Sequence, residues 1–319
     1  ISVRGLSKRY GGVKALNGLD LDLAANKVHA IVGENGAGKS TFMKILSGGV
    51  IPDAGSIEVM GEKFSSFTVQ SAAKLGIGIM YQELRLFQHR DVLTNLFPDR
   101  EMRIGPFIAR KKMAEIALPV LKSIGLDVPL DRIVGEVPLS DQQLIELARV
   151  LIEKPKLLIL DEPTSALNAR ESKRLLDLVK SLPAQGTTVL YVSHRLDEVF
   201  AVAEHITVMR NGSLVFSKPT KDLDIPTVIG GIVGEKTAAS MTKKSGSADL
   251  YATAAKVLEV KNLSNGKQVL DISLSVAAGE IVGVAGLIGS GADELLETLF
   301  GARPKVAGTV RVQGVEKAH

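Results

Sequence analysis

One short segment constrains the fold of this chain more than any other. It reads Gly33-Glu-Asn-Gly-Ala-Gly-Lys-Ser40 and fits the phosphate-loop pattern of a glycine, four residues, and then Gly-Lys-Ser. The apolar run at residues 28–32 predicts a strand before it, and residues 40–46 predict a helix after it. A strand, a glycine-rich turn and a helix in this order form the context in which the motif binds phosphate. We therefore predict an α/β domain with a phosphate-binding loop. His29, inside the strand, is interpreted as structural.

Each part of this loop has a role in binding a triphosphate. The glycines let backbone N–H groups approach phosphate oxygens, and the N-terminus of the helix adds a favourable dipole. Lys39 is expected to reach the β- and γ-phosphates, and the Ser40 hydroxyl to bind Mg²⁺. The sequence thus predicts binding of ATP with Mg²⁺. The predicted nucleotide-binding residues of the loop are Gly33, Glu34, Asn35, Gly36, Ala37, Gly38, Lys39, Ser40 and Thr41.

A second strand end supplies two acids. The apolar run at residues 157–160 predicts a buried strand, and Asp161 and Glu162 follow it directly. Because parallel strands deliver their carboxyl ends into one crevice, we expect both acids to lie beside the phosphate loop. Asp161 is then placed to hold Mg²⁺, and Glu162 to polarise the attacking water. Paired acids at a strand end can also cap a following helix, and Pro163 suggests a turn there. The presence of the phosphate loop favours a role in ATP hydrolysis over this capping role.

The first 235 residues alternate strands with helices. Strand patterns also occur at residues 18–23, 77–81 and 187–192. Helical spacing occurs at residues 110–124, 141–153 and 169–182. This alternation predicts a mainly parallel sheet. The helix-rich stretch at about residues 84–150 interrupts it and predicts an inserted helical subdomain.

The chain also contains an internal repeat. Residues 19–33 align without a gap with residues 272–286, and the same offset places residues 54–57 on residues 307–310. A shared offset on both sides of the loop argues against chance. The repeat predicts one complete unit followed by the start of a second copy.

Domain boundaries follow from the repeat. We predict a first domain at residues 1–235, a linker rich in Ala, Ser, Thr, Lys and Gly at residues 236–255, and the start of the second copy at residues 256–319. In the second copy the loop glycines remain, but Ala292 replaces the lysine and Asp293 replaces the Mg²⁺-binding hydroxyl. An acid beside phosphates is unfavourable because like charges repel.

Composition limits the remaining classes of protein. The chain has no cysteine, which excludes disulfides, zinc-thiolate sites and thiol nucleophiles. Aromatic residues make up 4% of the chain, without tryptophan, and the formal net charge is +4. The chain therefore has few side chains that could stack on bases and little excess positive charge to bind a nucleic-acid backbone. No apolar run approaches the roughly 20 residues that span a bilayer. We expect a cytoplasmic chain, and the absence of an initiator Met is consistent with trimming.

These motifs, in this order, resemble those of the nucleotide-binding domains of ABC transporters. The resemblance implies an antiparallel β subdomain beside the parallel sheet and assigns three more residues. Tyr10 resembles the aromatic residue that stacks on adenine, Gln82 the Q-loop glutamine that contacts Mg²⁺, and His194 the switch histidine that contacts the γ-phosphate. The catalytic set is therefore expected to be Glu162, His194 and Gln82, and the metal set Ser40, Gln82 and Asp161.

The resemblance fails at the family signature, which is usually Leu-Ser-Gly-Gly-Gln. Residues 137–141 align with it, and residues 139–143 resemble it by eye, but neither has the paired glycines. Pro138 has no N–H to offer, and Asp141 would repel a phosphate. Asn168 stands where the family usually has the D-loop aspartate.

Both losses affect one composite site. In ABC dimers each ATP lies between the phosphate loop of one domain and the signature of the other. Here the first signature and the second loop are both altered, so we expect that site not to hydrolyse ATP. The intact loop at residues 33–40 would serve the other site. We hypothesise that this chain alone binds MgATP and turns it over slowly.

Two tandem domains, a short linker and an altered second loop resemble the fused ATPases of bacterial monosaccharide importers of the ribose, galactose, xylose and rhamnose types. The altered signature also resembles that of the autoinducer-2 importer. This likeness covers nearly the whole chain. It implies ATP hydrolysis that energises sugar import at the inner face of the membrane. The implied partners are a membrane permease, a second nucleotide-binding domain or a homodimer, and indirectly a periplasmic solute-binding protein.

Two other classes of protein share the phosphate loop. A soluble ABC ATPase that acts on ribosomes or nucleic acid would carry a longer, strongly charged linker or a coiled coil, and residues 236–255 are neither. A plain phosphate-loop kinase would leave Gln82 and His194 unexplained at their spacings. Import therefore remains the favoured function, with no nucleic-acid partner.

Overall fold

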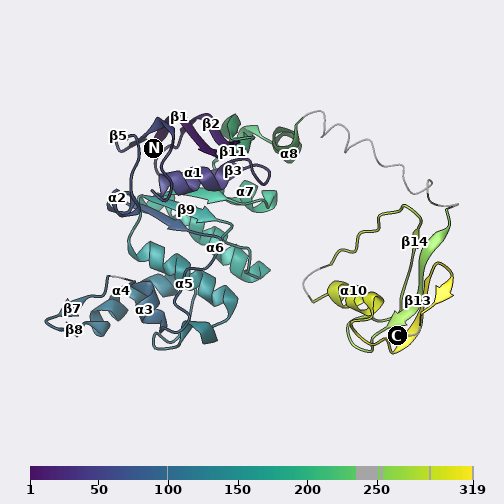
Figure 1. Ribbon diagram of the computed structural model, residues 1–319. Helices are drawn as coiled ribbons and strands as arrows, with labels where there is room; N and C mark the ends of the chain where they lie inside the picture. Colours follow the sequence, from purple (N-terminus) through teal and green to yellow (C-terminus); the bar gives the residue numbers. More distant parts are fainter. Residues whose placement is uncertain (99, 235–250, 252–253, 287–288, 318–319) are drawn as a thin grey trace. The chain divides into compact units, whose positions relative to one another are not determined.

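The computed structural model describes residues 1–98, 100–234, 251, 254–286 and 289–317 (Figure 1). The chain divides into two units, Ile1–Ala238 and Ala239–His319. Most of the predicted linker, residues 236–255, lies outside the described residues, so its boundaries stay a prediction.

A six-stranded sheet forms the centre of the first unit, in the order β12-β11-β3-β10-β9-β6. Five strands run parallel, and β12 pairs antiparallel with β11 at one edge. The inner strands are continuous apolar runs because helices cover both faces of a parallel sheet. The mainly parallel α/β fold is confirmed. The strands are β3 (Val28–Val32), β6 (Ile77–Met80), β9 (Leu157–Asp161), β10 (Thr188–Val192), β11 (His205–Arg210) and β12 (Ser213–Pro219).

A four-stranded antiparallel sheet packs beside it, in the order β2-β1-β4-β5. Its strands are β1 (Ser2–Tyr10), β2 (Val13–Asp22), β4 (Ala54–Val59) and β5 (Glu62–Phe64). Helix α1 (Lys39–Leu46) lies between the two sheets. Its buried Phe42 and Ile45 share one core with Leu6 of the antiparallel sheet and Leu190 of the parallel sheet. Burial on both sides fixes the helix, and with it the loop that opens it.

The inserted subdomain is helical, as predicted. Figure 1 shows α3, α4 and α5 gathered at one end of the first unit, with the β7–β8 hairpin at the tip. The bounds are α3 (Val92–Leu96), β7 (Arg103–Ile104), β8 (Phe107–Ile108), α4 (Arg110–Ser123), η1 (Val134–Glu136) and α5 (Leu139–Ile152).

Helix α5 begins two residues earlier than predicted. Pro138 is its N-cap residue, so the helix starts at Leu139 and Asp141 lies in the first turn. Proline suits a helix start because its missing N–H would have no partner there, and an acid in the first turn is favoured by the helix dipole. The signature-aligned segment therefore enters the helix instead of preceding it.

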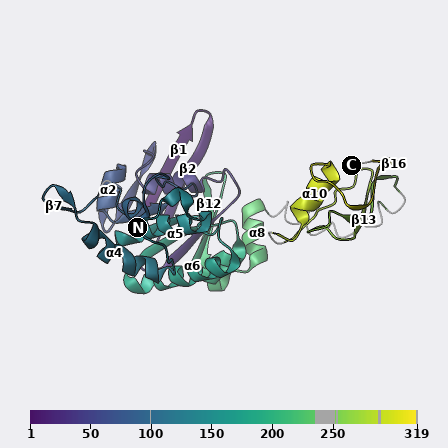
Figure 2. The ribbon, with the colours of Figure 1, turned by 90° about the horizontal axis from the view of Figure 1, so that it is seen from below.

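The remaining helices surround the parallel sheet; in Figure 2, α6 lies on one side of the first unit and the β1–β2 ribbon on the other. Asn168 caps α6, since its side chain accepts hydrogen bonds from the N–H groups of Arg170 and Glu171, both at 3.0 Å. None of the described helices has the length and apolar character needed to cross a membrane. The bounds are α2 (Val69–Lys74), α6 (Ala169–Ser181), η2 (Pro183–Gln185), α7 (Leu196–Val202), η3 (Thr220–Asp222) and α8 (Ile225–Val233).

His29 lies inside β3 and is 2% exposed. Its Nε2 is 3.0 Å from the carbonyl oxygen of Ala24, and its ring stacks on His205 at a centroid distance of 5.2 Å. Burial lowers the pKa of His29 from 6.5 to about 4. The geometry is that of a buried neutral histidine in the core.

This burial predicts a loss of stability in acid. Because the pKa of His29 is lower in the folded chain, the unfolded chain binds the extra proton between pH 6.5 and 4, and stability falls as the pH falls through that window. We expect His29→Leu to remove about 2 kcal/mol of the stability difference between pH 7 and pH 4.5. Urea unfolding of both proteins at each pH measures this. An unchanged difference would show that His29 does not titrate in this way.

The second unit repeats the antiparallel sheet of the first, with the order β14-β13-β15-β16. Gly291 caps its helix α10 with a φ of 94°, as Gly38 caps α1 with a φ of 100°. Residues 281–285, which align with β3, do not form a strand. In the first unit β3 is stabilised by β10 and β11, and no described strand of the second unit pairs with residues 281–285. The bounds are β13 (Lys256–Ser264), β14 (Ile272–Ala277), α10 (Ala292–Phe300), β15 (Ala307–Val312) and β16 (Val315–Glu316).

Candidate functional site

The carboxyl ends of four neighbouring parallel strands form one edge of the sheet, and each delivers a predicted site residue. The phosphate loop follows β3, Gln82 follows β6, Asp161 ends β9, and His194 follows β10. A cavity of about 1230 Å³ opens at this edge. It is lined by Val13, Ala15, Val32, Gly33, Glu34, Asn35, Gly36, Ala37, Gly38, Lys39, Ser40, Thr41, Gln82, Glu162, Ser193, His194, Leu196 and Ile232. The structure therefore brings the whole predicted loop, Gln82, Glu162 and His194 to one cavity.

Two glycines of the loop, Gly33 and Gly38, are required by its surroundings. Gly38 has a φ of 100°, which side chains rarely adopt, and a Cβ there would lie 2.5 Å from the carbonyl oxygen of Ala15. A Cβ on Gly33 would overlap the carbonyl oxygen of Met209. The loop is thus seated directly against the backbones of β2 and β11, which determines its shape.

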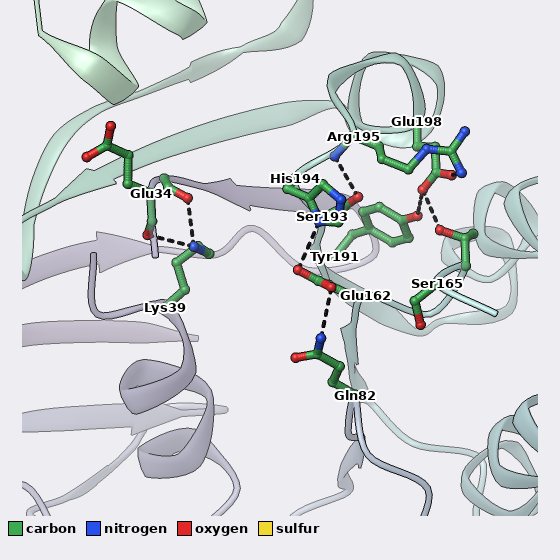
Figure 3. A network of polar contacts seen from close by, with 12 residues as sticks. Glu34, Lys39, Gln82, Glu162, Ser165, Tyr191, Ser193, His194, Arg195 and Glu198 are labelled. Carbon is green, nitrogen blue, oxygen red and sulfur yellow. Dashed lines mark hydrogen bonds and ion pairs between the residues drawn. The ribbon is translucent and has the colours of Figure 1, made fainter. Parts of the chain in front are cut away.

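Lys39 places a positive charge inside the loop. Its Nζ donates hydrogen bonds to the carbonyl oxygens of Gly33 at 2.7 Å and Glu34 at 3.0 Å (Figure 3). Burial lowers the pKa of Lys39, and the charges of Glu162 and Asp161 act in the opposite direction. A partly desolvated ammonium in a glycine-rich loop is a strong site for an anion.

Glu162 lies at the centre of the predicted catalytic set. The Nε2 of Gln82 donates to its Oε2 at 3.1 Å, and the Nδ1 of His194 lies 3.0 Å from its Oε1 (Figure 3). Its backbone N–H donates to the carbonyl oxygen of Val192 at 2.9 Å, and its φ is 49°, in the left-handed region. Both carboxylate oxygens are therefore oriented by side chains from the two flanking loops.

Asp161 ends β9 but does not line the cavity. Burial, together with the neighbouring charge of Glu162, raises its pKa to about 6. It directly precedes Glu162, which lines the cavity, and its charge opposes the lowering of the pKa of Lys39. A nearby cation would favour its ionised form.

The donor set fits Mg²⁺ held together with a substrate. Within the described part of the chain, no cluster of three or more His, Asp or Glu side chains could hold a metal by itself. In phosphate-transfer sites Mg²⁺ is held by one or two carboxylates plus substrate phosphates. Asp161, Ser40 and Gln82 supply one carboxylate, one hydroxyl and one amide oxygen, which suits such a shared site.

The structure does not place Tyr10 in the cavity. Its side chain is 48% exposed at the end of β1, and the Nζ of Lys8 lies 5.7 Å from its ring centroid. Val13 and Ala15, on β2 of the same hairpin, line the cavity instead. They carry no chemical signal in the sequence, and only the pairing of β1 with β2 reveals their position.

Sequence reasoning missed a buried acid next to the site. Glu198 is 2% exposed, and its Oε2 accepts hydrogen bonds from Tyr191 at 2.7 Å and Thr164 at 2.8 Å. It also forms an ion pair with Arg195 (Figure 3). Burial and the hydrogen bond to Glu198 raise the pKa of Tyr191. Glu198 thus joins the segment after Glu162 to the loop that carries His194, and the Arg195–Glu198 spacing was its only signal in the sequence.

The signature-aligned segment carries negative charge. Burial and the charge of Glu171 raise the pKa of Asp141, which is the mark of an unfavourable site for a second anion. On the same helix, the Nε2 of Gln143 donates to the Oγ of Ser165 at 3.1 Å. The start of α5 is thus connected to the segment that follows Glu162.

Known proteins resemble this chain in sequence. A family model described as ABC transporter matches residues 16–165. The ribose import ATP-binding protein RbsA 3 of Rubrobacter xylanophilus is 39% identical over 98% of this chain and 62% of its own length. A putative ribose/galactose/methyl galactoside import ATP-binding protein 1 of Rhizobium meliloti is 38% identical over 98% of this chain and 61% of its own length. The chain therefore spans less than two thirds of these relatives.

Solved structures resemble it in fold. An ATP-binding cassette of an ABC transporter in its ADP conformation has a TM-score of 0.64 and 26% identity, over 73% of this chain and 98% of its own. A nucleotide-free cassette from an ABC transporter has a TM-score of 0.63 and 24% identity, over 76% and 97%.

Proposed function

We propose that this chain is an ATPase of the ABC transporter family, since residues 16–165 match that family's model and relatives of 38–39% identity are import ATP-binding proteins. We propose further that it binds MgATP and hydrolyses it to energise the import of a sugar. One observation carries the hydrolytic part: Glu162 is held between Gln82 and His194 at a cavity lined by the complete phosphate loop. The fold alone would support nucleotide binding. The oriented acid adds a group that can act on water.

The chain's own residues divide the work between binding and proton transfer. The loop and Lys39 bind the β- and γ-phosphates, and they remain in place as charge develops on the transferred group. Glu162 accepts a hydrogen bond from the attacking water and draws its proton away. Gln82 and His194 orient that carboxylate, and His194, 70% exposed, can also reach the γ-phosphate. Mg²⁺, when bound, neutralises charge on the phosphate oxygens.

The names of the relatives support sugar import. Both are described as import ATP-binding proteins, for ribose or for ribose, galactose and methyl galactoside. We therefore place this chain at the inner face of a membrane, bound to a permease and paired with a second nucleotide-binding domain. A periplasmic solute-binding protein would deliver the sugar from the other side.

We also propose that one of the two composite sites is inactive. In the signature-aligned segment the pKa of Asp141 is raised by burial and by the charge of Glu171, and the second unit begins α10 with Ala292 and Asp293. A phosphate between these two surfaces would meet acids in place of N–H groups and an ammonium. Hydrolysis would then occur only at the site with Lys39.

Co-purification tests the transport role. We expect the chain to form a defined complex in detergent with a sugar permease of the ABC importer class, and to hydrolyse ATP faster in that complex. The matched experiment offers ribosomes and duplex DNA at physiological salt. Stable binding to either of these, with no complex with the permease, would refute import and support a non-transport ABC ATPase.

A further inference from the structure

Two side chains on α5 hold the loop that carries Gln82 by its backbone. The Oε2 of Glu146 accepts a hydrogen bond from the N–H of Arg85 at 2.9 Å. The Nη1 of Arg149 donates to the carbonyl oxygen of Arg85 at 2.8 Å. The two side chains are joined by an ion pair, 2.8 Å from Nη2 to Oε1. Both polar groups of one backbone residue, three positions after Gln82, are thus bound by one ion pair.

The burial of Glu146 means that this contact carries the desolvation cost of a buried carboxylate. Glu146 is 0% exposed, and the residues before and after it on the helix, Ile145 and Leu147, are buried as well. Burial raises its pKa, and the hydrogen bond from Arg85 and the charge of Arg149 oppose that rise. A buried ion pair is weak evidence for stability, because hydrophobic residues of similar volume often replace one without loss. The pair therefore calls for another role.

The same loop is also held at its other end. The guanidinium of Arg85 lies 3.6 Å from the centroid of the Tyr81 ring, a short cation–π distance. The Tyr81 hydroxyl lies 3.5 Å from the Oγ of Ser47, the C-cap residue of α1. Gln82, directly after Tyr81, thus lies in a segment fixed to α1 on one side and α5 on the other.

We propose that Glu146 and Arg149 are positioning residues for ATP hydrolysis, which set Gln82 against Glu162 by clamping the backbone of Arg85. The inference rests on the proposed function and deepens it. Gln82 Nε2 lies 3.1 Å from the Glu162 carboxylate, a contact that a small shift of the loop would break. The clamp links the helix that begins in the altered signature to the hydrolytic acid of the same domain, so a movement of α5 is transmitted to Gln82.

The test removes the clamp while keeping the core filled. The variant is Glu146→Leu with Arg149→Met, two apolar side chains that occupy similar volume. The control is Glu153→Leu with Arg100→Met, which removes another ion pair at the end of α5 without touching Arg85. Glu146→Gln is the conservative variant, because its amide oxygen can still accept the N–H of Arg85, and its effects are expected to be intermediate.

Two measurements on the full chain test whether Glu146 and Arg149 hold the backbone of Arg85 and whether this contact affects ATP hydrolysis. In hydrogen exchange without nucleotide, we expect the Arg85 amide to exchange at least about tenfold faster in the clamp variant than in wild type and control. In single-turnover hydrolysis with protein in excess, we expect a rate about tenfold lower and MgATP affinity within about threefold. In a Gln82→Ala background, the clamp variant is expected to change the rate less than about twofold.

Each outcome decides the proposal. Unchanged exchange at Arg85 would overturn the clamp. Equal slowing with and without Gln82 would overturn the positioning role, since the effect would then not pass through Gln82. A wild-type chain that neither binds nor hydrolyses MgATP would refute the proposed function and the positioning role with it, whereas normal binding and hydrolysis with unchanged exchange would refute the clamp alone.

Discussion

Lys39→Ala is expected to weaken MgATP binding by about 30- to 1000-fold. The Lys39 ammonium lies inside the loop, within hydrogen-bonding distance of two loop carbonyls, and is partly desolvated. Truncating one partner of a desolvated charge pair costs about 2–4 kcal/mol, and each 1.4 kcal/mol is a factor of ten in affinity. Removal of the ammonium leaves the phosphates with the loop N–H groups and the helix dipole alone. Isothermal titration calorimetry with MgATP measures the change.

The matched control is Lys74→Ala, which removes a lysine from the last turn of α2, away from the cavity. Its affinity is expected to stay within about twofold of wild type, since an exposed lysine contributes little. If Lys39→Ala bound MgATP as tightly as this control, the phosphate loop would not be the nucleotide site. The assignment of the cavity would then be wrong.

Glu162→Gln is expected to lower hydrolysis by about 10²- to 10³-fold while leaving MgATP affinity within about threefold. The amide keeps the size of the side chain but loses the charge that draws a proton from water. General acid–base groups contribute about 10²- to 10⁴-fold in rate. Single-turnover phosphate release and calorimetry separate the rate from the affinity. Glu83→Gln, an exposed acid in the neighbouring loop, is the control and is expected to behave as wild type.

The rate of ATP turnover by the wild-type chain alone is the reference for the Glu162→Gln variant. Because one signature and one loop are altered, we expect its own turnover to fall well below the roughly 1–10³ s⁻¹ usual for enzymes. Fast turnover by the chain alone, abolished in Glu162→Gln, would contradict the need for a complementary domain. A Glu162→Gln variant that hydrolyses at the wild-type rate would remove the acid from the mechanism.

Much of the site could be predicted because its chemistry is written in local patterns. The phosphate loop and the acid pair each follow an apolar run, and parallel strands bring their carboxyl ends to one edge. The assignments of Gln82 and His194 came from resemblance. The structure adds that both lie within hydrogen-bonding distance of Glu162. Their catalytic roles stay predictions until they are measured.

The rest could not be predicted because it depends on which faces meet after folding. Glu146 and Glu198 lie on helices, where an acid between apolar residues usually marks a solvent-exposed face. Here each is buried by contact with a loop distant in sequence. The start of α5 was misplaced by two residues, since helix ends are set by capping contacts more than by periodicity. Tyr10 does not line the cavity in the structure, and its contact with adenine, which the family resemblance implies, stays a prediction.

The left-handed backbone at Glu162 has a consequence for engineering this chain. A side chain in that conformation costs about 1–2 kcal/mol that glycine would avoid. A screen that selects only for thermal stability would therefore favour glycine at position 162. The selected proteins would be more stable but would no longer hydrolyse ATP. Libraries built on this scaffold need turnover as the selected trait, with thermal tolerance scored second.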